Sequence, residues 1–155
     1  MARGLRLYGL RDHLMRLCRS QFEAIQLFEF YRFPEVFSGH PRDERHPIPA
    51  LYPKTCWPQS WSATTVFSLL EAMLGIYPCA PMKRMTIEPD LPEWLPDLTL
   101  KNLHVGQAVV SIQFRRGPDG ATEYQVLDQQ GPLEVVHGRS PWSVRDDLGG
   151  QGVTA

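Results

Sequence analysis

The sequence has no run of about 18 apolar residues, so it does not predict a membrane-spanning helix. Its N-terminus carries arginines without the apolar stretch of a signal peptide. It also has no Pro- or Gly-rich low-complexity composition, because hydrophobic residues make up 43% of its 155 residues and charged residues 21%. These absences favour a soluble, cytoplasmic globular protein without a membrane partner.

An excess of one charge is also missing. The chain has sixteen basic and seventeen acidic residues, which gives a net charge of −1. The chain as a whole therefore has no electrostatic footprint for nucleic acid or an anionic membrane, and a neutral substrate is the easier partner. Five arginines do crowd the first nineteen residues, and we interpret them as a solvated helix face. They are Arg3, Arg6, Arg11, Arg16 and Arg19.

Cysteine is scarce, and its spacing excludes the common cysteine frameworks. Cys18, Cys56 and Cys79 are odd in number and never form a CxxC pair, which favours free thiols in a reducing compartment. Cys56 shares a loop with His40 and His46, but the spacing matches no compact zinc motif. We therefore expect neither a metal nor another cofactor, and we interpret Cys56 as a buried small hydrophobe rather than a nucleophile.

The first half of the chain has helical periodicity. Residues 1–8 predict one helix that ends at Gly9, and residues 12–29 predict a second with one apolar stripe. The short connection between them predicts an αα-hairpin. A third helix is expected to end at Gly75. Its expected buried side consists of Trp61, Val66, Phe67, Leu70, Met73 and Leu74.

Near Met85 the apolar period changes from helical to two, which predicts strands. Five are expected, and the glycine-containing turns between them favour antiparallel hairpins. We thus divide the chain into a helical unit at 1–76, a linker at 77–83, an antiparallel β-module at 84–137 and a disordered tail at 138–155. The expected strands are 84–88, 98–103, 108–114, 123–127 and 133–136.

Between the second and third helices, residues 32–61 form a loop studded with prolines. A connection longer than about 12–15 residues inside a compact domain is typically a binding or active-site loop, or else disordered. This one is too aromatic to be disordered. Glu35 lies between Pro34, which fixes its own φ angle, and a turn that ends at Gly39, so stiff backbone holds its carboxylate. The sequence therefore makes Glu35 the first candidate for chemistry.

The loop and the helix after it resemble the C-terminal region of amylo-α-1,6-glucosidase and glycogen-debranching-type glycoside hydrolases, which are six-hairpin, glucoamylase-like (α/α)6-barrel enzymes. The family motif has a proline-glutamate pair, an aromatic residue, a glycine, a tyrosine-proline step and a cysteine followed by a proline-glutamine-x-tryptophan run. Here it is matched by Pro34-Glu35-Val36-Phe37, Gly39, Tyr52-Pro53 and Cys56-Trp57-Pro58-Gln59-Ser60-Trp61. The resemblance covers about residues 2–114.

The resemblance implies that Glu35 is the catalytic base of an inverting hydrolysis. Such an enzyme needs a second carboxyl group as the acid, roughly 6.5–9.5 Å from the base. In this family the acid comes from an earlier barrel segment. The expected fold is therefore α+β, with the C-terminal helices of an incomplete (α/α)6 barrel followed by a small antiparallel β-module. We expect a fragment that is inactive alone, with a missing N-terminal barrel segment and an oligosaccharide or polysaccharide as its partners.

Four further residues could bind the substrate. Trp57 and Trp61 offer ring faces for sugar stacking, and Arg32 and Gln59 offer hydrogen bonds to hydroxyl groups. Three of them also have a simpler interpretation, because the tryptophans could pack in the core and Gln59 could bond the loop backbone. Two alternatives for the whole chain stay open. One is a trehalase-like or mannosylglycerate-hydrolase-like fragment, and the other is a non-catalytic carbohydrate-binding or interaction protein.

Overall fold

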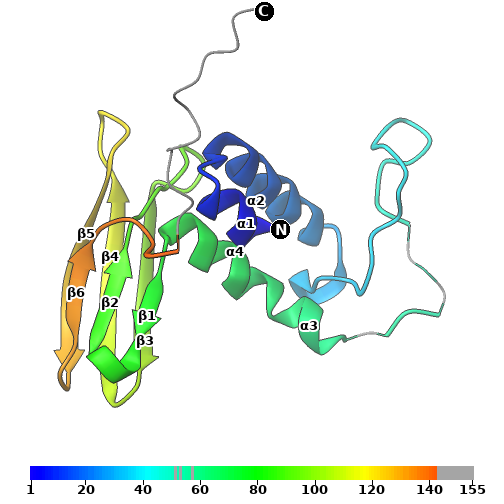
Figure 1. Ribbon diagram of the computed structural model, residues 1–155. Helices are drawn as coiled ribbons and strands as arrows, with labels where there is room; N and C mark the ends of the chain where they lie inside the picture. Colours follow the sequence, from blue (N-terminus) through cyan, green and yellow to red (C-terminus); the bar gives the residue numbers. More distant parts are fainter. Residues whose placement is uncertain (51, 53, 57, 143–155) are drawn as a thin grey trace, which may run out of the picture.

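The computed structural model describes residues 1–50, 52, 54–56 and 58–142, and it has a mixed α+β fold (Figure 1). The helices are α1 (Ala2–Leu7), α2 (Arg11–Ile25), α3 (Ser60–Ala63) and α4 (Thr65–Leu74), with short 3-10 turns η1 (Glu29–Tyr31) and η2 (Ala80–Met82). The strands are β1 (Tyr77–Cys79), β2 (Arg84–Ile87), β3 (Asp97–Val105), β4 (Ala108–Arg116), β5 (Thr122–Gln130) and β6 (Glu134–His137). The α+β class expected from the sequence is confirmed.

The turn between α1 and α2 ends the first helix with a left-handed glycine. Gly9 has a φ of 71°, its N–H donates to the Arg6 carbonyl at 3.1 Å, and the Leu10 N–H donates to the Leu5 carbonyl at 2.9 Å. This pair of bonds satisfies carbonyls that the end of α1 would leave free. The chain reverses here as predicted, and α1 contacts both α2 and α4.

The third predicted helix is divided at Thr64 into α3 and α4, and it buries a different face from the one expected. Leu69, Ala72, Met73 and Leu74 are buried, whereas Trp61 and Phe67 are 61% and 71% exposed. The expected buried side is therefore wrong at both aromatic positions. The cause is the orientation of α4, because Leu69, Ala72 and Met73 pack against Leu14 and Cys18 of α2.

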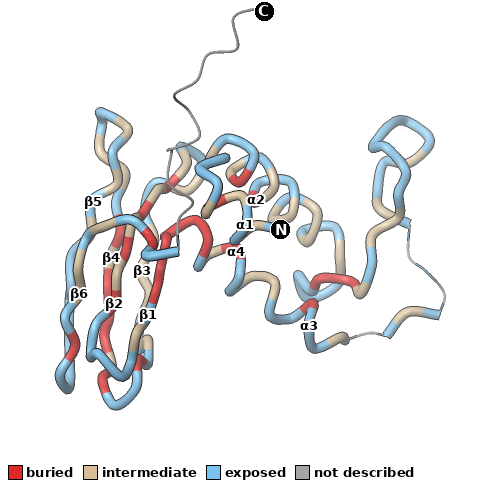
Figure 2. Tube along the Cα trace, viewed as in Figure 1, coloured by how far each residue is buried: buried red, intermediate tan, exposed pale blue. Residues whose placement is uncertain are grey.

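Two three-stranded sheets enclose the larger hydrophobic core. Strands β3, β4 and β5 form an antiparallel sheet, and β1, β2 and β6 form the other. Inward-facing residues of β2 and β4 meet in this core, together with Leu74 at the end of α4 and Ile76 just after it. Figure 2 shows buried positions gathered along these strands and at the end of α4. The core residues from β2 and β4 are Met85, Ile87, Val110, Ile112 and Phe114.

The strand pairing differs from the prediction in two places. All five predicted strands are present, but residues 77–83, expected to be a linker, contain β1, which pairs antiparallel with β2. In addition β6 pairs parallel with β2 through Met85↔Val135 rather than closing an antiparallel hairpin. Spacing alone could not predict this pairing, because β3, β4 and β5, which lie between β2 and β6 in the chain, belong to the other sheet. Beyond β6, the Gly138 N–H donates to the Ile87 carbonyl at 2.9 Å, and most of the predicted tail lies outside the described residues.

Arg6 connects the helical hairpin to the strands, which corrects its interpretation as part of a solvated face. It is only 5% exposed, and its guanidinium donates to the backbone carbonyl and the carboxylate of Glu88 and, at 3.5 Å, to the Met73 carbonyl. Arg11 contacts the other Glu88 oxygen at 2.6 Å and Asp90 at 3.4 Å. Burial, and then the charge of Arg11, lower the pKa of Arg6 from its ordinary value.

Replacing Arg6 by methionine is expected to lower the free energy of unfolding by about 1–3 kcal/mol, because the part-buried Glu88 carbonyl would lose the guanidinium donor and the Met73 carbonyl would keep only the Asp90 N–H. Urea unfolding followed by circular dichroism measures the change. Arg3→Met, at an exposed position of the same helix, is the matched control and should stay within about 0.5 kcal/mol of the parent. Equal effects of the two substitutions would contradict the connecting role of Arg6.

Among the described residues, no helix combines the length and apolar character needed to span a bilayer.

Candidate active site

The start of the long loop is fixed to the helices by buried backbone. Phe33 is 5% exposed and belongs to the core between α2 and α4. The next residue, Pro34, is also buried, and its carbonyl accepts a hydrogen bond of 2.9 Å from the Ser62 hydroxyl on α3. Beyond this anchor the loop projects away from the helices, as the cyan trace at the right of Figure 1 shows. Glu35 therefore sits where the anchored and projecting parts of the loop meet.

The Glu35 carboxylate is held by two donors from the far end of the same loop. The Cys56 backbone N–H donates to Oε2 at 2.7 Å, and the Gln59 side-chain amide donates to Oε1 at 3.4 Å. Gln59 is also the N-cap of α3, because its side-chain oxygen accepts from the Ser60 N–H at 3.1 Å. Glu35 thus ties together segments more than twenty positions apart.

The two carboxylate oxygens are held unequally, and this affects what Glu35 could do. Oε2 takes a short, charge-assisted bond, whereas Oε1 meets only the long contact from Gln59. A carboxylate oxygen has two lone pairs, so Oε1 keeps acceptor capacity for a water molecule or a hydroxyl group. Glu35 is half-buried, which leaves that oxygen within reach of solvent.

The structure brings Arg32 and Gln59 to one hollow of about 370 Å³. Trp61 does not line this hollow. It projects from α3 on another side and lines a separate hollow with Leu17 and Leu69. Trp57 lies outside the described residues. Of the four predicted substrate-binding residues, Arg32 and Gln59 therefore share a hollow near Glu35, and Trp61 does not. The hollow is lined by Tyr31, Arg32, Phe33, Pro58, Gln59, Ala63 and Val66.

Reasoning from the sequence missed Tyr31 and Ser62. Tyr31 lines the hollow with a φ of 53°, and Phe30 before it has a φ of 55°. Two successive non-glycine residues in the left-handed region are uncommon, and no sequence signal for such a turn exists without a glycine or asparagine. Ser62 contributes one buried hydrogen bond to Pro34, and only the tertiary structure identifies that partner.

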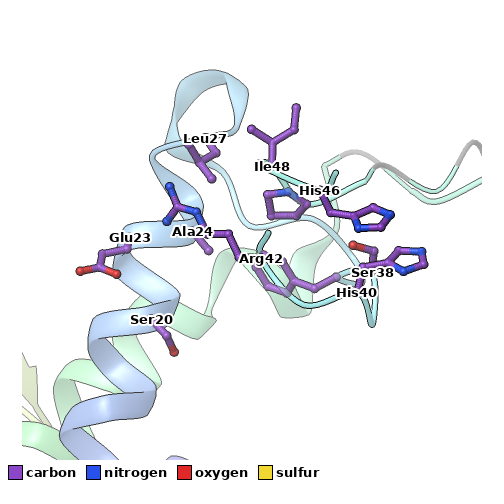
Figure 3. A pocket seen from close by; sticks show the side chains of 11 residues that line it. Ser20, Glu23, Ala24, Leu27, Ser38, His40, Arg42, His46 and Ile48 are labelled. Atoms are coloured by element: carbon purple, nitrogen blue, oxygen red, sulfur yellow. The ribbon is translucent and has the colours of Figure 1, made fainter. Parts of the chain in front are cut away.

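The histidines of the loop form a stacked pair instead of a metal site. The His40 and His46 rings are parallel, with centroids 4.3 Å apart, and the His46 Nδ1 lies 3.1 Å from Asp43 Oδ1. Figure 3 shows them beside a hollow of about 230 Å³ between the loop and α2, with Arg42 reaching back toward the helix. Within the described part of the chain, no three or more His, Cys, Asp and Glu residues are placed to hold a metal ion.

The cysteines have distinct environments. Cys56 is exposed, so its interpretation as a buried small hydrophobe is wrong; its backbone is fixed by Glu35 while the side chain stays outside the core. Cys18 is the fully buried thiol, and burial raises its pKa to about 11. Cys18 is therefore protonated at neutral pH and is no candidate nucleophile.

The chain matches no protein-family model, no curated protein and no solved structure. Only the resemblance of the loop motif and the geometry of Glu35 therefore bear on the function of the chain.

Proposed function

We propose that the chain is the C-terminal part of a glycoside hydrolase that resembles amylo-α-1,6-glucosidase, and that Glu35 is the general base of an inverting hydrolysis of α-glucosidic bonds. The observation that carries this proposal is the fixed Glu35 carboxylate, with Oε2 bonded to the Cys56 N–H and Oε1 only loosely held. The same motif residues that carry the resemblance, Glu35, Cys56 and Gln59, are those that contact one another.

In this reaction Oε1 of Glu35 removes a proton from water while the water oxygen attacks the anomeric carbon. The bond between that carbon and the glycosidic oxygen breaks, and a second carboxyl group protonates the leaving oxygen. The two donors that contact Glu35 are amide groups, which do not act as the acid, and an inverting enzyme holds its acid roughly 6.5–9.5 Å from the base. We assign the acid to the N-terminal barrel segment of the complete enzyme, as the resemblance implies.

Packing against such a segment would also account for exposed aromatic residues on the helices. Trp61 and Phe67 project from α3 and α4 and are more than half exposed. Contact with neighbouring barrel helices would bury these rings and stabilise the assembly. We propose that these helices, with the hairpin of α1 and α2, are the last helices of an (α/α)6 barrel. The cytoplasm is the proposed location, since the free cysteines suit a reducing compartment.

A trehalase-like or mannosylglycerate-hydrolase-like enzyme is compatible with the same base loop, because specificity in these barrels depends on other segments. A non-catalytic carbohydrate-binding protein is the second candidate function. The observation that favours it is the hollow beside Glu35, where Arg32, Gln59 and the Tyr31 ring could hold a sugar without hydrolysing it.

The purified 155-residue chain is expected to release no glucose from maltooligosaccharides or trehalose, because it supplies the base without the partner acid. Fusing the barrel segment of a debranching-type enzyme in front of Met1 should restore hydrolysis. The control is the barrel segment alone, which should also be inactive. Turnover by the unfused chain that disappears on Glu35→Gln would show a complete site in these residues. An inactive fusion that is folded would favour the non-catalytic alternative.

A further inference from the structure

The turn before Arg32 presents two aromatic rings to solvent at a cost in backbone strain. Phe30 and Tyr31 have φ angles of 55° and 53° and are 74% and 70% exposed. Side chains disfavour the left-handed region, and large rings normally gain by burial. Both preferences are overridden at adjacent positions, and strain of this kind clusters at functional sites.

The contacts around this turn hold it in place. The Tyr31 N–H donates to the Phe28 carbonyl at 3.2 Å, and the Arg32 N–H donates to the Glu29 carbonyl at 3.3 Å. Just before the turn in the chain, the Phe28 ring meets the Phe37 ring with centroids 5.8 Å apart. Just after it, the Arg32 guanidinium lies 5.2 Å from the centre of the Phe30 ring, in cation–π range. One aromatic ring of the turn therefore orients Arg32, and Tyr31 is left facing the hollow.

The hollow has the size and chemistry of a small-molecule site. Its volume of about 370 Å³ lies within the range for ligand pockets, and Pro58, Ala63 and Val66 supply an apolar wall. Arg32 and Gln59 are the polar groups on its rim. A pyranose ring has one face of C–H groups and a rim of hydroxyls, which suits an aromatic face flanked by hydrogen-bonding side chains. Gln59 also contacts Glu35, which does not itself line the hollow, so Gln59 connects a ring bound here to the proposed base.

We propose that Tyr31 is a stacking platform for one glucosyl ring of an α-linked oligosaccharide, and that Arg32 and Gln59 bind the hydroxyl groups of that ring. The left-handed turn keeps the platform open by directing the Tyr31 side chain away from the core. The choice of sugar rests on the proposed function, whereas the platform itself rests on the strain, exposure and hollow.

The test titrates the purified chain with maltoheptaose by isothermal calorimetry and compares Tyr31→Gly, Tyr31→Phe and Tyr8→Ala. Glycine removes the ring and accepts the left-handed backbone, so the affinity should fall about tenfold while the chain stays folded. Tyr31→Phe keeps the ring face and should bind like the parent. Tyr8 is another exposed tyrosine that does not line the hollow, and its replacement should leave binding unchanged.

Two results would overturn the platform. One is a parent chain that does not bind maltoheptaose, and the other is a Tyr31→Gly variant that binds it as tightly as the parent. The second result would mean that the turn reverses the chain in a strained conformation and has no role in binding. The proposed function fails separately, if the barrel fusion retains turnover after Glu35→Gln. In that event a loss of binding in Tyr31→Gly would still identify a sugar site, of the non-catalytic kind.

Discussion

Glu35→Gln is expected to lower kcat of the barrel fusion by about 10²–10⁴-fold and to leave KM nearly unchanged. Glutamine keeps the shape of the side chain and can still accept the Cys56 N–H bond through its carbonyl oxygen. It cannot take a proton from water, because an amide lacks the basic oxygen of a carboxylate. The loss should therefore fall on the chemical step, and steady-state kinetics with a maltooligosaccharide measures it.

Glu44→Gln is the matched control for this substitution. Glu44 is an exposed carboxylate of the same loop, so its replacement changes the charge equally without touching the Cys56 and Gln59 contacts. Its kcat should stay within about twofold of the parent, since surface substitutions of this kind perturb a protein little. If azide occupies the place of the attacking water, it should restore part of the turnover of Glu35→Gln. Equal kcat values for the two variants would remove Glu35 from the mechanism.

Gly75→Ala is expected to lower the free energy of unfolding by about 2–5 kcal/mol, the largest effect among the stability changes considered. Gly75 ends α4 with a φ of 56°, where a side chain costs roughly 1–2 kcal/mol. An added Cβ would also lie 2.6 Å from Arg6 Nη2 and 2.8 Å from the Glu88 carbonyl oxygen. Crowding of a packed site costs typically about 1–3 kcal/mol more.

Gly9→Ala separates these two costs. Gly9 has a φ of 71°, but a Cβ added there meets nothing within 4 Å. It should therefore show only the backbone cost of about 1–2 kcal/mol. Urea unfolding of both variants, read from the midpoint at an unchanged m-value, gives the difference. Equal losses of unfolding free energy would mean that Arg6 and Glu88 move at little cost to admit the added Cβ. The close packing of the helical half against the strand half at Gly75 would then be contradicted.

Much of the secondary structure could be predicted because its signals are local. Gly9 and Gly75 end helices through left-handed conformations that glycine adopts without steric cost. Alternation of apolar residues located β2 through β6. Local signals could not predict the parallel pairing of β6 with β2, because that pairing depends on where the chain lies in space after the β3–β4–β5 sheet. They also could not give the rotation of α4, which is set by its packing against α2.

The candidate site likewise has one part that local sequence signals predicted and one part that only the tertiary structure revealed. A stiff proline-glutamate step singles out Glu35 in the sequence, and the loop length indicates a functional segment. Its hydrogen-bond partners, Cys56 and Gln59, follow only from the closure of that loop. The Tyr31 turn had no signal, because a non-glycine residue in the left-handed region reflects surroundings rather than its own preference.

By itself, the sequence determined the α+β class, the division into a helical half and a strand half, and the choice of Glu35 as the candidate residue. Each of these depends on periodicity, backbone stiffness or turn chemistry within a few residues. Only the tertiary structure decided that Arg6 is buried against Glu88 and that Trp61 stays exposed. An arginine on an amphipathic helix and a tryptophan at a helix start have the same local signals whether buried or exposed. Their environment is set by packing between elements that are distant in the chain.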